Sequence, residues 1–287
     1  MILPDLTIPS RIDQNWEYSG IDSPDSCLDP KHFKSYPYSV SYQYNSRGYR
    51  DREWPDDLQN AVWCIGDSFT VGIGSPVEHT WSRILESKTG LRTINISMDG
   101  ASNNWIARHA VKILNIVKPS AMVIHWSYLH RREGITHINS KAKSNFLNYY
   151  KNIKDPSWPD ITTVENFGSL PIHIQNELLN FNDDPKWRKQ ISDEELRLWH
   201  IRSEIHEDIS NTVECIDLVD YHKQDSRLIH SFIPKFIGGD QSNFYQQLKT
   251  DNPVIQELHY LDLARDGHHY DIKTSENFVQ QIMQVLS

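Results

Sequence analysis

The sequence predicts an α/β fold in which helices flank a doubly wound parallel sheet. A short apolar run at 61–65 and strand-like segments at 91–97 and 121–127 alternate with helical patterns at about 78–88 and 103–117. Runs of this length suit buried strands, and strands that alternate with helices favour right-handed crossovers between parallel strands. With 287 residues, of which 38% are hydrophobic, the chain is long enough to bury such a core.

Both helices between these strands have an apolar face and a recognisable end. In the first, Trp81, Ile84 and Leu85 share one face, and Gly90 stops the helix. The second ends before Pro119 and carries its apolar residues at helical spacing, namely Trp105, Ile106, Ala110, Ile113, Leu114 and Val117. We therefore expect both helices to pack on the sheet.

The second half of the chain continues the pattern less regularly. Ser192 and Glu195 form a capping box that predicts a helix over 193–214, with an apolar stripe of Ile201, Ile205, Ile209 and Val213. Residues 228–234 are typical of a further buried strand. The chain closes with an amphipathic helix whose apolar positions are Phe278, Ile282 and Val285.

Two regions lie outside this alternation. Residues 1–57 are interpreted as an N-terminal extension packed on a core domain of 58–287. Within the extension, alternating aromatic and polar residues predict a strand from Tyr36 to Tyr44, followed by a turn from Asn45 to Gly48. Periodicity weakens after residue 130, which predicts a middle insertion over about 130–225.

Composition excludes several classes of function. The net charge is −9 and no long Lys/Arg block occurs, so nucleic acid is not an expected partner. The three cysteines, Cys27, Cys64 and Cys215, are far apart, which argues against a disulfide framework or a thiolate zinc site. No signal peptide and no apolar run of membrane-spanning length is visible, so we expect a cytoplasmic or virion-associated protein without a membrane span.

The first candidate for chemistry is Ser68, in the motif Gly66-Asp67-Ser68 at the end of the first strand. Ligands of open α/β sheets bind beyond the carboxyl ends of the strands, so a serine there faces the expected cleft. An ordinary strand-to-turn transition uses the same residue types, and the tripeptide alone does not discriminate between the two interpretations.

The second candidate is the loop before the last helix, which contains Asp266 and His269. A serine nucleophile needs a base for its proton, and that base needs a partner that fixes its tautomer. An Asp three residues before a His can supply both groups from one loop. Alone, this spacing also suits surface or metal-like histidines, but its placement opposite the Ser68 motif favours one cleft with a Ser-His-Asp triad.

At this point the sequence resembles the SGNH, or GDSL-like, hydrolases. The resemblance covers roughly 61–127 and 260–286, where GDSFT, TINISMDGAS and ARDGHHYD are similar to three of the family's sequence blocks. The segment NSRGYRDREWP also resembles one found before the first strand in some members, and the spread of motifs is similar to SGNH-like proteins of bacterial viruses. The resemblance implies a flavodoxin-like three-layer fold and hydrolysis of esters.

By the same resemblance, Ser68 is the nucleophile, Asp266 and His269 complete the triad, and the Ser68 and Gly100 N–H groups bind the oxyanion. The sequence departs from the family after the third strand, where an asparagine usually supplies a further oxyanion donor and none occurs here. Losing one donor can slow an enzyme by about 10²- to 10³-fold. The candidates for a replacement are Asn103, Asn104 and Ser127, with an Asn favoured, although Asn103 and Asn104 also suit a helix start.

Residues beside these motifs are the candidate substrate contacts: Asp67, Trp126 and Arg131. A solvated ion-pair cluster is the alternative for Arg131 and its charged neighbours. His125, His130 and His137 match no metal-ligand spacing, and Gly72 and Gly74 form no nucleotide-binding motif, so neither metal nor cofactor is expected. These two glycines are interpreted as allowing a tight loop beside Ser68.

The sequence therefore favours a serine esterase that acts on a small-molecule or glycan ester, with O-acetyl groups on a carbohydrate as the preferred substrate. Two alternatives remain. One is a non-catalytic binding or structural module that keeps the same fold and pocket, favoured by the missing asparagine. The other is an acyltransferase that uses the same triad with an alcohol in place of water.

Overall fold

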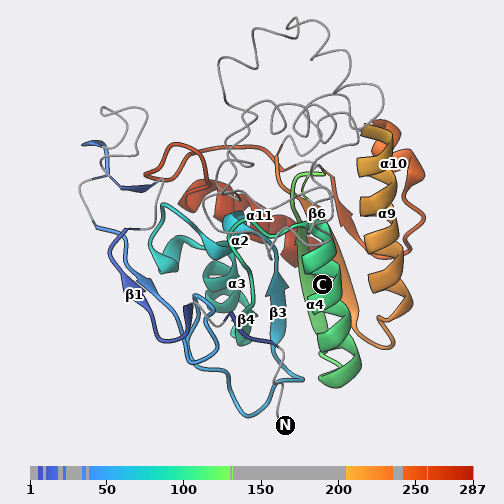
Figure 1. Ribbon diagram of the computed structural model, residues 1–287, viewed down its shortest axis with the longest axis horizontal. Helices are drawn as coiled ribbons and strands as arrows, with labels where there is room; N and C mark the ends of the chain where they lie inside the picture. Colours follow the sequence, from blue (N-terminus) through green and yellow to red (C-terminus); the bar gives the residue numbers. More distant parts are fainter. Residues whose placement is uncertain are drawn as a thin grey trace, which may run out of the picture. The chain divides into compact units, whose positions relative to one another are not determined.

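The computed structural model describes residues 6–8, 11–18, 22–23, 34–36, 39–129, 131, 205–234, 242–256 and 258–286 (Figure 1). The chain divides into two compact units, one made of Met1–Tyr128 and Thr212–Ser287 and the other of Leu129–Asn211. The second unit corresponds in sequence to part of the expected insertion, and nearly all of it lies outside the described residues.

A five-stranded parallel sheet forms the centre of the first unit. Its strands are β3 (Val62–Ile65), β4 (Thr93–Asn95), β5 (Ala121–Trp126), β6 (Arg227–Phe232) and β7 (Val254–Ile255). They lie in the order β4-β3-β5-β6-β7, and every pairing is parallel. The chain order in the sheet is thus 2-1-3-4-5, the flavodoxin-like order, in which the direction of winding reverses between β3 and β5.

Helices cover the two faces of the sheet, which makes the predicted α/β fold three-layered. α3 (Trp81–Thr89) and α11 (Ile272–Leu286) pack against each other on one face. α4 (Asn103–Ile116) and the Thr212–Tyr221 part of α9 (Ile205–Tyr221) cover the other (Figure 1). Right-handed crossovers explain this division. The step from β3 to β4 and the step from β4 to β5 run in opposite directions across the sheet, so α3 and α4, which make these steps, lie on opposite faces. The predicted fold class is confirmed.

The segments predicted as strands form strands, most of them shorter than expected. β4 takes three of the residues predicted at 91–97, β5 takes six of those at 121–127, and β6 takes five of those at 228–234 and begins one residue earlier. All residues of β3 and β5 are buried, as central strands of a covered sheet should be. β7, together with α10 (Ser242–Gln247) before it, was not predicted, because two residues are too short to give a periodicity.

The helix predictions differ from the structure mainly at their ends. α3 begins at Trp81, after a 3-10 turn over Val77–His79, and α4 matches its predicted span. α9 runs to Tyr221 rather than ending near residue 214, and its predicted start, with Ser192 and Glu195, lies outside the described residues. In α11, Phe278 and Ile282 are buried as expected, whereas Val285 is 38% exposed. None of the described helices is both long and apolar enough to span a membrane.

The described part of the N-terminal extension packs on the core with little regular structure. Among the described residues of the strand predicted from Tyr36 to Tyr44, only β2 (Tyr42–Gln43) is a strand, and it pairs with β1 (Asn15–Trp16). Of the alternating side chains, Val40, Tyr42 and Tyr44 are buried in one core cluster. The turn at Asn45–Gly48 is present: the Gly48 N–H donates to the Asn45 carbonyl at 2.8 Å, and Gly48 has a φ of +83°.

Candidate active site

Ser68 lies at the switch point of the sheet, where β3 ends and a short helix, α2 (Ser68–Val71), begins. Asp67 caps this helix, because its carboxylate accepts the Phe69 N–H at 3.0 Å. As the first residue of α2, Ser68 has no helical acceptor for its own N–H, and none is found for it in the described part of the chain. The serine therefore offers a hydroxyl and an N–H group at one point.

The structure brings Ser68, His269 and Asp266 into one hydrogen-bonded chain. His269 Nε2 lies 2.8 Å from Ser68 Oγ, and His269 Nδ1 lies 2.5 Å from Asp266 Oδ2. All three residues are nearly buried, with 3%, 3% and 8% of Ser68, His269 and Asp266 exposed. The distances are those that a nucleophile, its base and the base's orienting carboxylate require.

The loop itself fixes the carboxylate of Asp266. Oδ1 accepts the backbone N–H groups of His268 and His269 at 3.0 and 3.1 Å, which leaves Oδ2 for the His269 ring. Burial alone would raise the pKa of Asp266, but the bond and charge of His269 and the two backbone N–H groups together lower it below its ordinary value. Asp266 is therefore anionic where His269 needs a negative partner.

Gly74 lets a second loop pack directly against this carboxylate. A Cβ added at Gly74 would lie 2.9 Å from Asp266 Cγ and 2.9 Å from Ala264 Cβ, and the φ of Gly74 is +79°. Gly72 has a φ of +78° and ends α2. Both glycines thus serve the tight loop beside the nucleophile that the sequence indicated, and only a residue without a side chain fits at Gly74.

The loop that carries Gly100 runs beside the Ser68 motif. Met98 N–H donates to the Gly66 carbonyl at 3.2 Å, and the Ala101 N–H donates back to Met98 at 3.0 Å. Between them Gly100 is exposed, with a φ of +73°, and a Cβ there would meet nothing within 4 Å. Its exposure and its place after β4 are compatible with the oxyanion role that the family resemblance implies.

The other candidate oxyanion donors are differently placed. Asn103 is fully buried, and its amide donates to the Ser127 carbonyl at 3.3 Å and to Thr212 Oγ1 at 3.0 Å. Both amide hydrogens are thereby used, so the expected oxyanion role of Asn103 does not fit this arrangement. Its Oδ1 also accepts the Ser127 N–H at 2.8 Å, so Asn103 fixes the end of β5. Asn104 is half-buried at the start of α4.

Ser127 is also engaged, because its hydroxyl donates to Asp67 Oδ2 at 2.6 Å. Together with the cap on α2, this bond uses both carboxylate oxygens of Asp67, whose side chain is fully buried. The observed contacts of Asp67 are structural, and its expected contact with substrate stays a prediction. The residue instead ties the nucleophile's helix to the end of β5, on the strand next to β3.

Trp126, one of the other two expected substrate contacts, does not face a cleft. Trp126 is fully buried, and its indole N–H donates to His230 Nδ1 at 3.1 Å. β5 is covered on both faces, so a side chain at its end points into a helix layer and not toward solvent. Arg131 is half-buried and belongs to the second unit, and its role stays a prediction.

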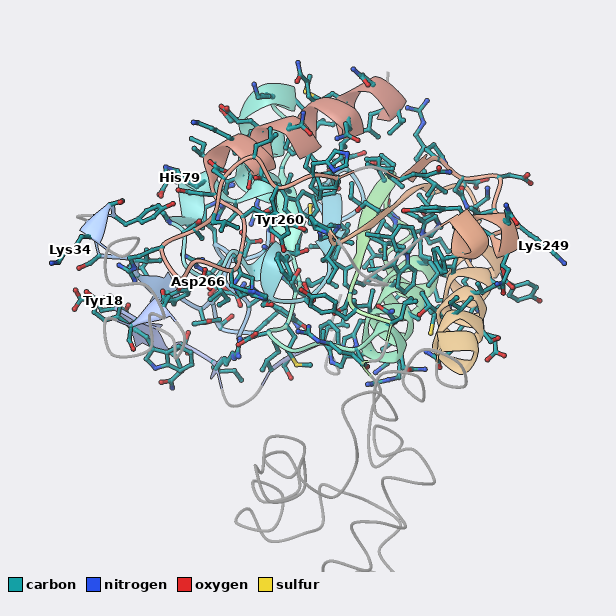
Figure 2. All side chains as sticks on the ribbon, turned by 90° about the horizontal axis from the view of Figure 1, so that it is seen from above. Tyr18, Lys34, His79, Lys249, Tyr260 and Asp266 are labelled. Carbon is teal, nitrogen blue, oxygen red and sulfur yellow. The ribbon has the colours of Figure 1, made fainter. Side chains whose placement is uncertain are left out.

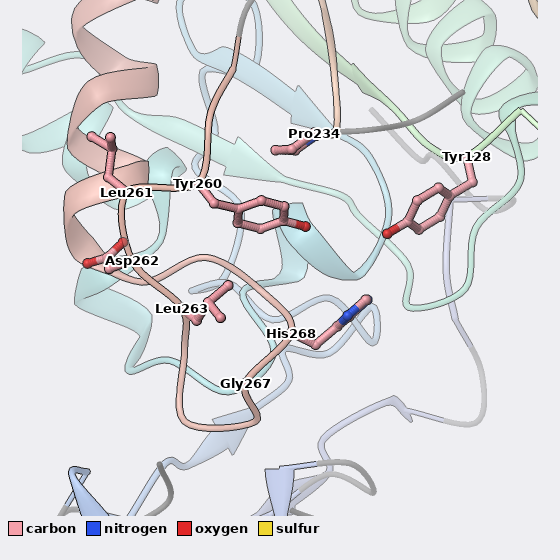
Figure 3. A pocket seen from close by; sticks show the side chains of 8 residues that line it. All are labelled: Tyr128, Pro234, Tyr260, Leu261, Asp262, Leu263, Gly267 and His268. Atoms are coloured by element: carbon pink, nitrogen blue, oxygen red, sulfur yellow. The ribbon is translucent and has the colours of Figure 1, made fainter. Parts of the chain in front are cut away.

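A pocket of about 550 Å³ opens beside the triad (Figure 3). Its size is that of a small-molecule site. In Figure 3 the rings of Tyr128 and Tyr260 extend into the pocket from opposite sides, and His268 lies below them. The full lining is Tyr128, Pro234, Tyr260, Leu261, Asp262, Leu263, Gly267 and His268.

Phe69, which follows the nucleophile, connects this pocket to the triad. Its ring centroid lies 4.5 Å from that of His269, and 6.2 and 6.4 Å from those of Tyr128 and Tyr260. No sequence pattern singled out Phe69, Tyr128 or Tyr260. Tyr128 follows directly on the end of β5, and this position was the one available signal, since residues just beyond parallel strands line the ligand crevice.

His125, considered above as a metal ligand, is instead a buried core residue. Its Nδ1 lies 2.8 Å from Ser231 Oγ, and its Nε2 is hydrogen-bonded to the Tyr270 hydroxyl. Burial lowers the pKa of His125 to about 3, and burial is also the main cause that lowers the pKa of His109 to about 4. His130 and His137 lie outside the described residues.

The lowered pKa values of His125 and His109 predict that the protein loses stability in mild acid. In the unfolded chain both take up protons near pH 6.5, whereas the folded protein keeps them neutral until pH 3–4. The free energy of unfolding should therefore fall as pH falls below 6.5, by up to about 1.4 kcal/mol per pH unit for each histidine. Urea unfolding between pH 6.5 and 5, above the range where carboxylates titrate, measures this slope. In His125→Gln the slope should drop by one histidine's share, and an unchanged slope would contradict the assignment.

Comparison with known proteins gives structural likeness only. No protein-family model matches the sequence, and neither does any curated protein. Solved structures that are similar to the chain include the psychrotrophic esterase EstA from Pseudoalteromonas sp., at 11% identity and a TM-score of 0.42 over 79% of this chain and 96% of the other. A carbohydrate acetylesterase family member from Sinorhizobium meliloti matches at 13% identity and a TM-score of 0.38, over 79% of this chain and 97% of the other.

A family two carbohydrate esterase from Clostridium thermocellum, solved with cellohexaose, is also similar, at 10% identity and a TM-score of 0.40. That match spans 81% of this chain and 65% of the other. At identities this low, the similarity is one of fold and says nothing about the reaction. The chemistry is therefore indicated by the arrangement of Ser68, His269 and Asp266.

Proposed function

We propose that this protein is a serine ester hydrolase of the SGNH type. The observation that carries the proposal is the hydrogen-bonded chain from Asp266 through His269 to Ser68, at the switch point of the sheet. An N–H group without an acceptor, a pocket and a nearly buried nucleophile accompany it. A surface serine in an ordinary turn would need none of these.

In the proposed reaction, His269 Nε2 removes the Ser68 proton while Ser68 Oγ attacks the ester carbonyl. The Ser68 N–H, with that of Gly100, stabilises the oxyanion of the tetrahedral intermediate. His269 then protonates the leaving alcohol, and the acyl group remains on Ser68. Water, activated by His269, attacks this acyl-enzyme, releases the acid and restores the serine. Asp266 holds the Nδ1 proton of His269 throughout.

The pocket beside Phe69 supports an uncharged substrate. None of its described lining residues is a lysine or an arginine, and its one carboxylate, Asp262, accepts the backbone N–H groups of Lys273 and Thr274 at the start of α11. Two tyrosines, His268 and aliphatic side chains remain to contact the ligand. Such a lining suits a neutral ester with apolar and hydroxyl-bearing faces, and an O-acetylated carbohydrate remains the preferred substrate.

Labelling with a fluorophosphonate probe tests the proposal. The probe phosphonylates an activated serine, so we expect the wild-type protein to label, Ser68→Ala not to label, and His269→Ala to label far more slowly. Ser226→Ala serves as a control for the site, because this buried serine donates to the Pro119 carbonyl and is not in the chain to His269. Wild-type protein that neither labels at Ser68 nor turns over short-chain p-nitrophenyl esters would favour the binding-module alternative.

A further inference from the structure

Side chains of the N-terminal extension contact the loop that carries Asp266 and His269, which we call the catalytic loop. We propose that Asp22 and Tyr42 are positioning residues that set the place of Asp266 and, through it, the orientation of His269. This inference rests on the proposed function. It makes the extension a part of the catalytic machinery, although neither residue contacts substrate.

The first connection is a buried ion pair. Arg265, the residue before Asp266, extends its guanidinium to Asp22, with 3.1 Å between Arg265 Nη2 and Asp22 Oδ2. Both side chains are fully buried, and the Arg265 guanidinium also lies over the Tyr18 ring, 4.5 Å from its centroid. Figure 2, in which Tyr18 and Asp266 are labelled, shows the catalytic loop beside the extension. Breaking such a pair leaves a buried charge uncompensated, so the loop cannot move away without a large cost.

The second connection is the hydroxyl of Tyr42. It donates to the same oxygen, Asp22 Oδ2, and accepts the Gly74 N–H at 2.8 Å. Tyr42 is fully buried, and burial is the largest of the causes that raise the pKa of its hydroxyl, which therefore stays protonated and able to donate. One oxygen of Asp22 thus joins the catalytic loop, through Arg265, to the Gly74 loop, through Tyr42.

These two loops meet at Asp266. The Arg265 N–H donates to the Gly74 carbonyl at 3.1 Å, and Gly74 is the residue whose Cα packs against the Asp266 carboxyl group. Arg265, which precedes Asp266, and Gly74, which packs against the Asp266 carboxyl group, are therefore both connected to Asp22, Arg265 directly and Gly74 through Tyr42. A shift of Arg265 or Gly74 would move Asp266 Oδ2 relative to His269 Nδ1 and would change the hydrogen bond of 2.5 Å between these two atoms.

Other contacts of the extension support the same two loops. Arg50, which is nearly buried, donates to the carbonyls of Val71, Gly72 and Ser75 at 3.2, 2.5 and 2.8 Å, and stacks over the Tyr42 ring. Tyr36 donates to the carbonyl of Leu263, three residues before Asp266. The extension therefore contacts both loops at several points, and Tyr42 is the residue that touches the Asp22 junction and the Gly74 loop together.

The test compares Tyr42→Phe with a matched control, Asp51→Asn. Tyr42→Phe keeps the buried ring and removes only the hydroxyl that joins Asp22 to Gly74. Asp51 is another buried carboxylate of the extension, but it pairs with Arg83 and Arg92 and accepts the Asn95 N–H, away from the catalytic loop. For each variant we would measure kcat and KM with p-nitrophenyl acetate, the midpoint of thermal unfolding, and the far-downfield proton NMR signal of His269 Nδ1–H.

We expect Tyr42→Phe to lower kcat by about 10- to 100-fold with little change in KM, since small displacements of catalytic groups have effects of this size. The Nδ1–H signal should weaken or shift upfield. Asp22→Asn should do the same, whereas Asp51→Asn should lower the unfolding midpoint and leave both kcat and the signal near their wild-type values. The signal reports the Asp266–His269 bond without requiring turnover.

Three results would overturn the inference. Wild-type kcat and an unchanged signal in Tyr42→Phe would show that the hydroxyl positions nothing. Equal losses of kcat in Tyr42→Phe and Asp51→Asn, in proportion to their loss of stability, would show a general structural effect. A wild-type protein that lacks Ser68-dependent turnover would instead remove the proposed function, and the inference with it; this failure is recognised before any extension variant is compared.

Discussion

His269→Ala and Ser68→Ala are each expected to lower kcat for p-nitrophenyl acetate by about 10⁶-fold, and the double variant to lose no more than either single one. The reason is the single hydrogen bond of 2.8 Å that joins His269 Nε2 to Ser68 Oγ. Without the base, the hydroxyl is a weak nucleophile, and without the nucleophile, the base has no proton to take. The two residues therefore act as one unit.

The measurement is steady-state turnover of the two single variants and the double variant, with the thermal midpoint of each as a check on folding. His222→Ala is the matched control, because this half-buried histidine bonds to Asn115 on the helix layer, far in sequence from both motifs. Independent losses that multiply in the double variant would contradict a shared proton-transfer unit. A His222→Ala variant as inactive as His269→Ala would show that the assay reports folding.

The parts of the fold and site that could be predicted are those encoded by neighbouring residues. β3 is a continuous apolar run, β5 is apolar except for His125, and the helices between them carry an apolar face, so the parallel sheet followed from local patterns. Asp266 and His269 stand three residues apart in one loop, where a carboxylate and an imidazole meet without any distant contact. The prediction of Ser68 as the nucleophile required one assumption about the fold, namely that β3 leads to the switch point of the sheet.

Local patterns could not show which way a side chain points at the end of a strand covered on both faces. Asp67 and Trp126 flank the expected cleft in sequence, yet one caps α2 and the other packs under the helices. Nor could they show contacts between distant parts of the chain. Asp22 lies 243 residues from Arg265, and neither residue belongs to a pattern that indicates a partner. The strand β7 was missed because its two residues carry no period.

Asp266→Asn is expected to lower kcat by about 10⁴-fold while the fold stays intact. The structure gives a specific reason. Oδ1 of Asp266 accepts the N–H groups of His268 and His269, so an asparagine must keep its oxygen at that position. Its amide nitrogen then occupies the place of Oδ2 and presents a hydrogen to His269 Nδ1. The imidazole must accept there, which puts its own proton on Nε2, facing Ser68.

A histidine in this tautomer cannot accept the serine's proton, although every distance in the triad is preserved. The loss should therefore lie in kcat, with KM close to the wild-type value, because the pocket of Tyr128 and Tyr260 is untouched. Asp266→Ala is the informative partner, since it removes the carboxylate without forcing the wrong tautomer, and it should retain more activity than Asp266→Asn if tautomer control dominates. A fall of less than tenfold in Asp266→Asn would mean that Asp266 does not orient His269, and would leave the Ser68–His269 pair without the partner that the structure assigns to it.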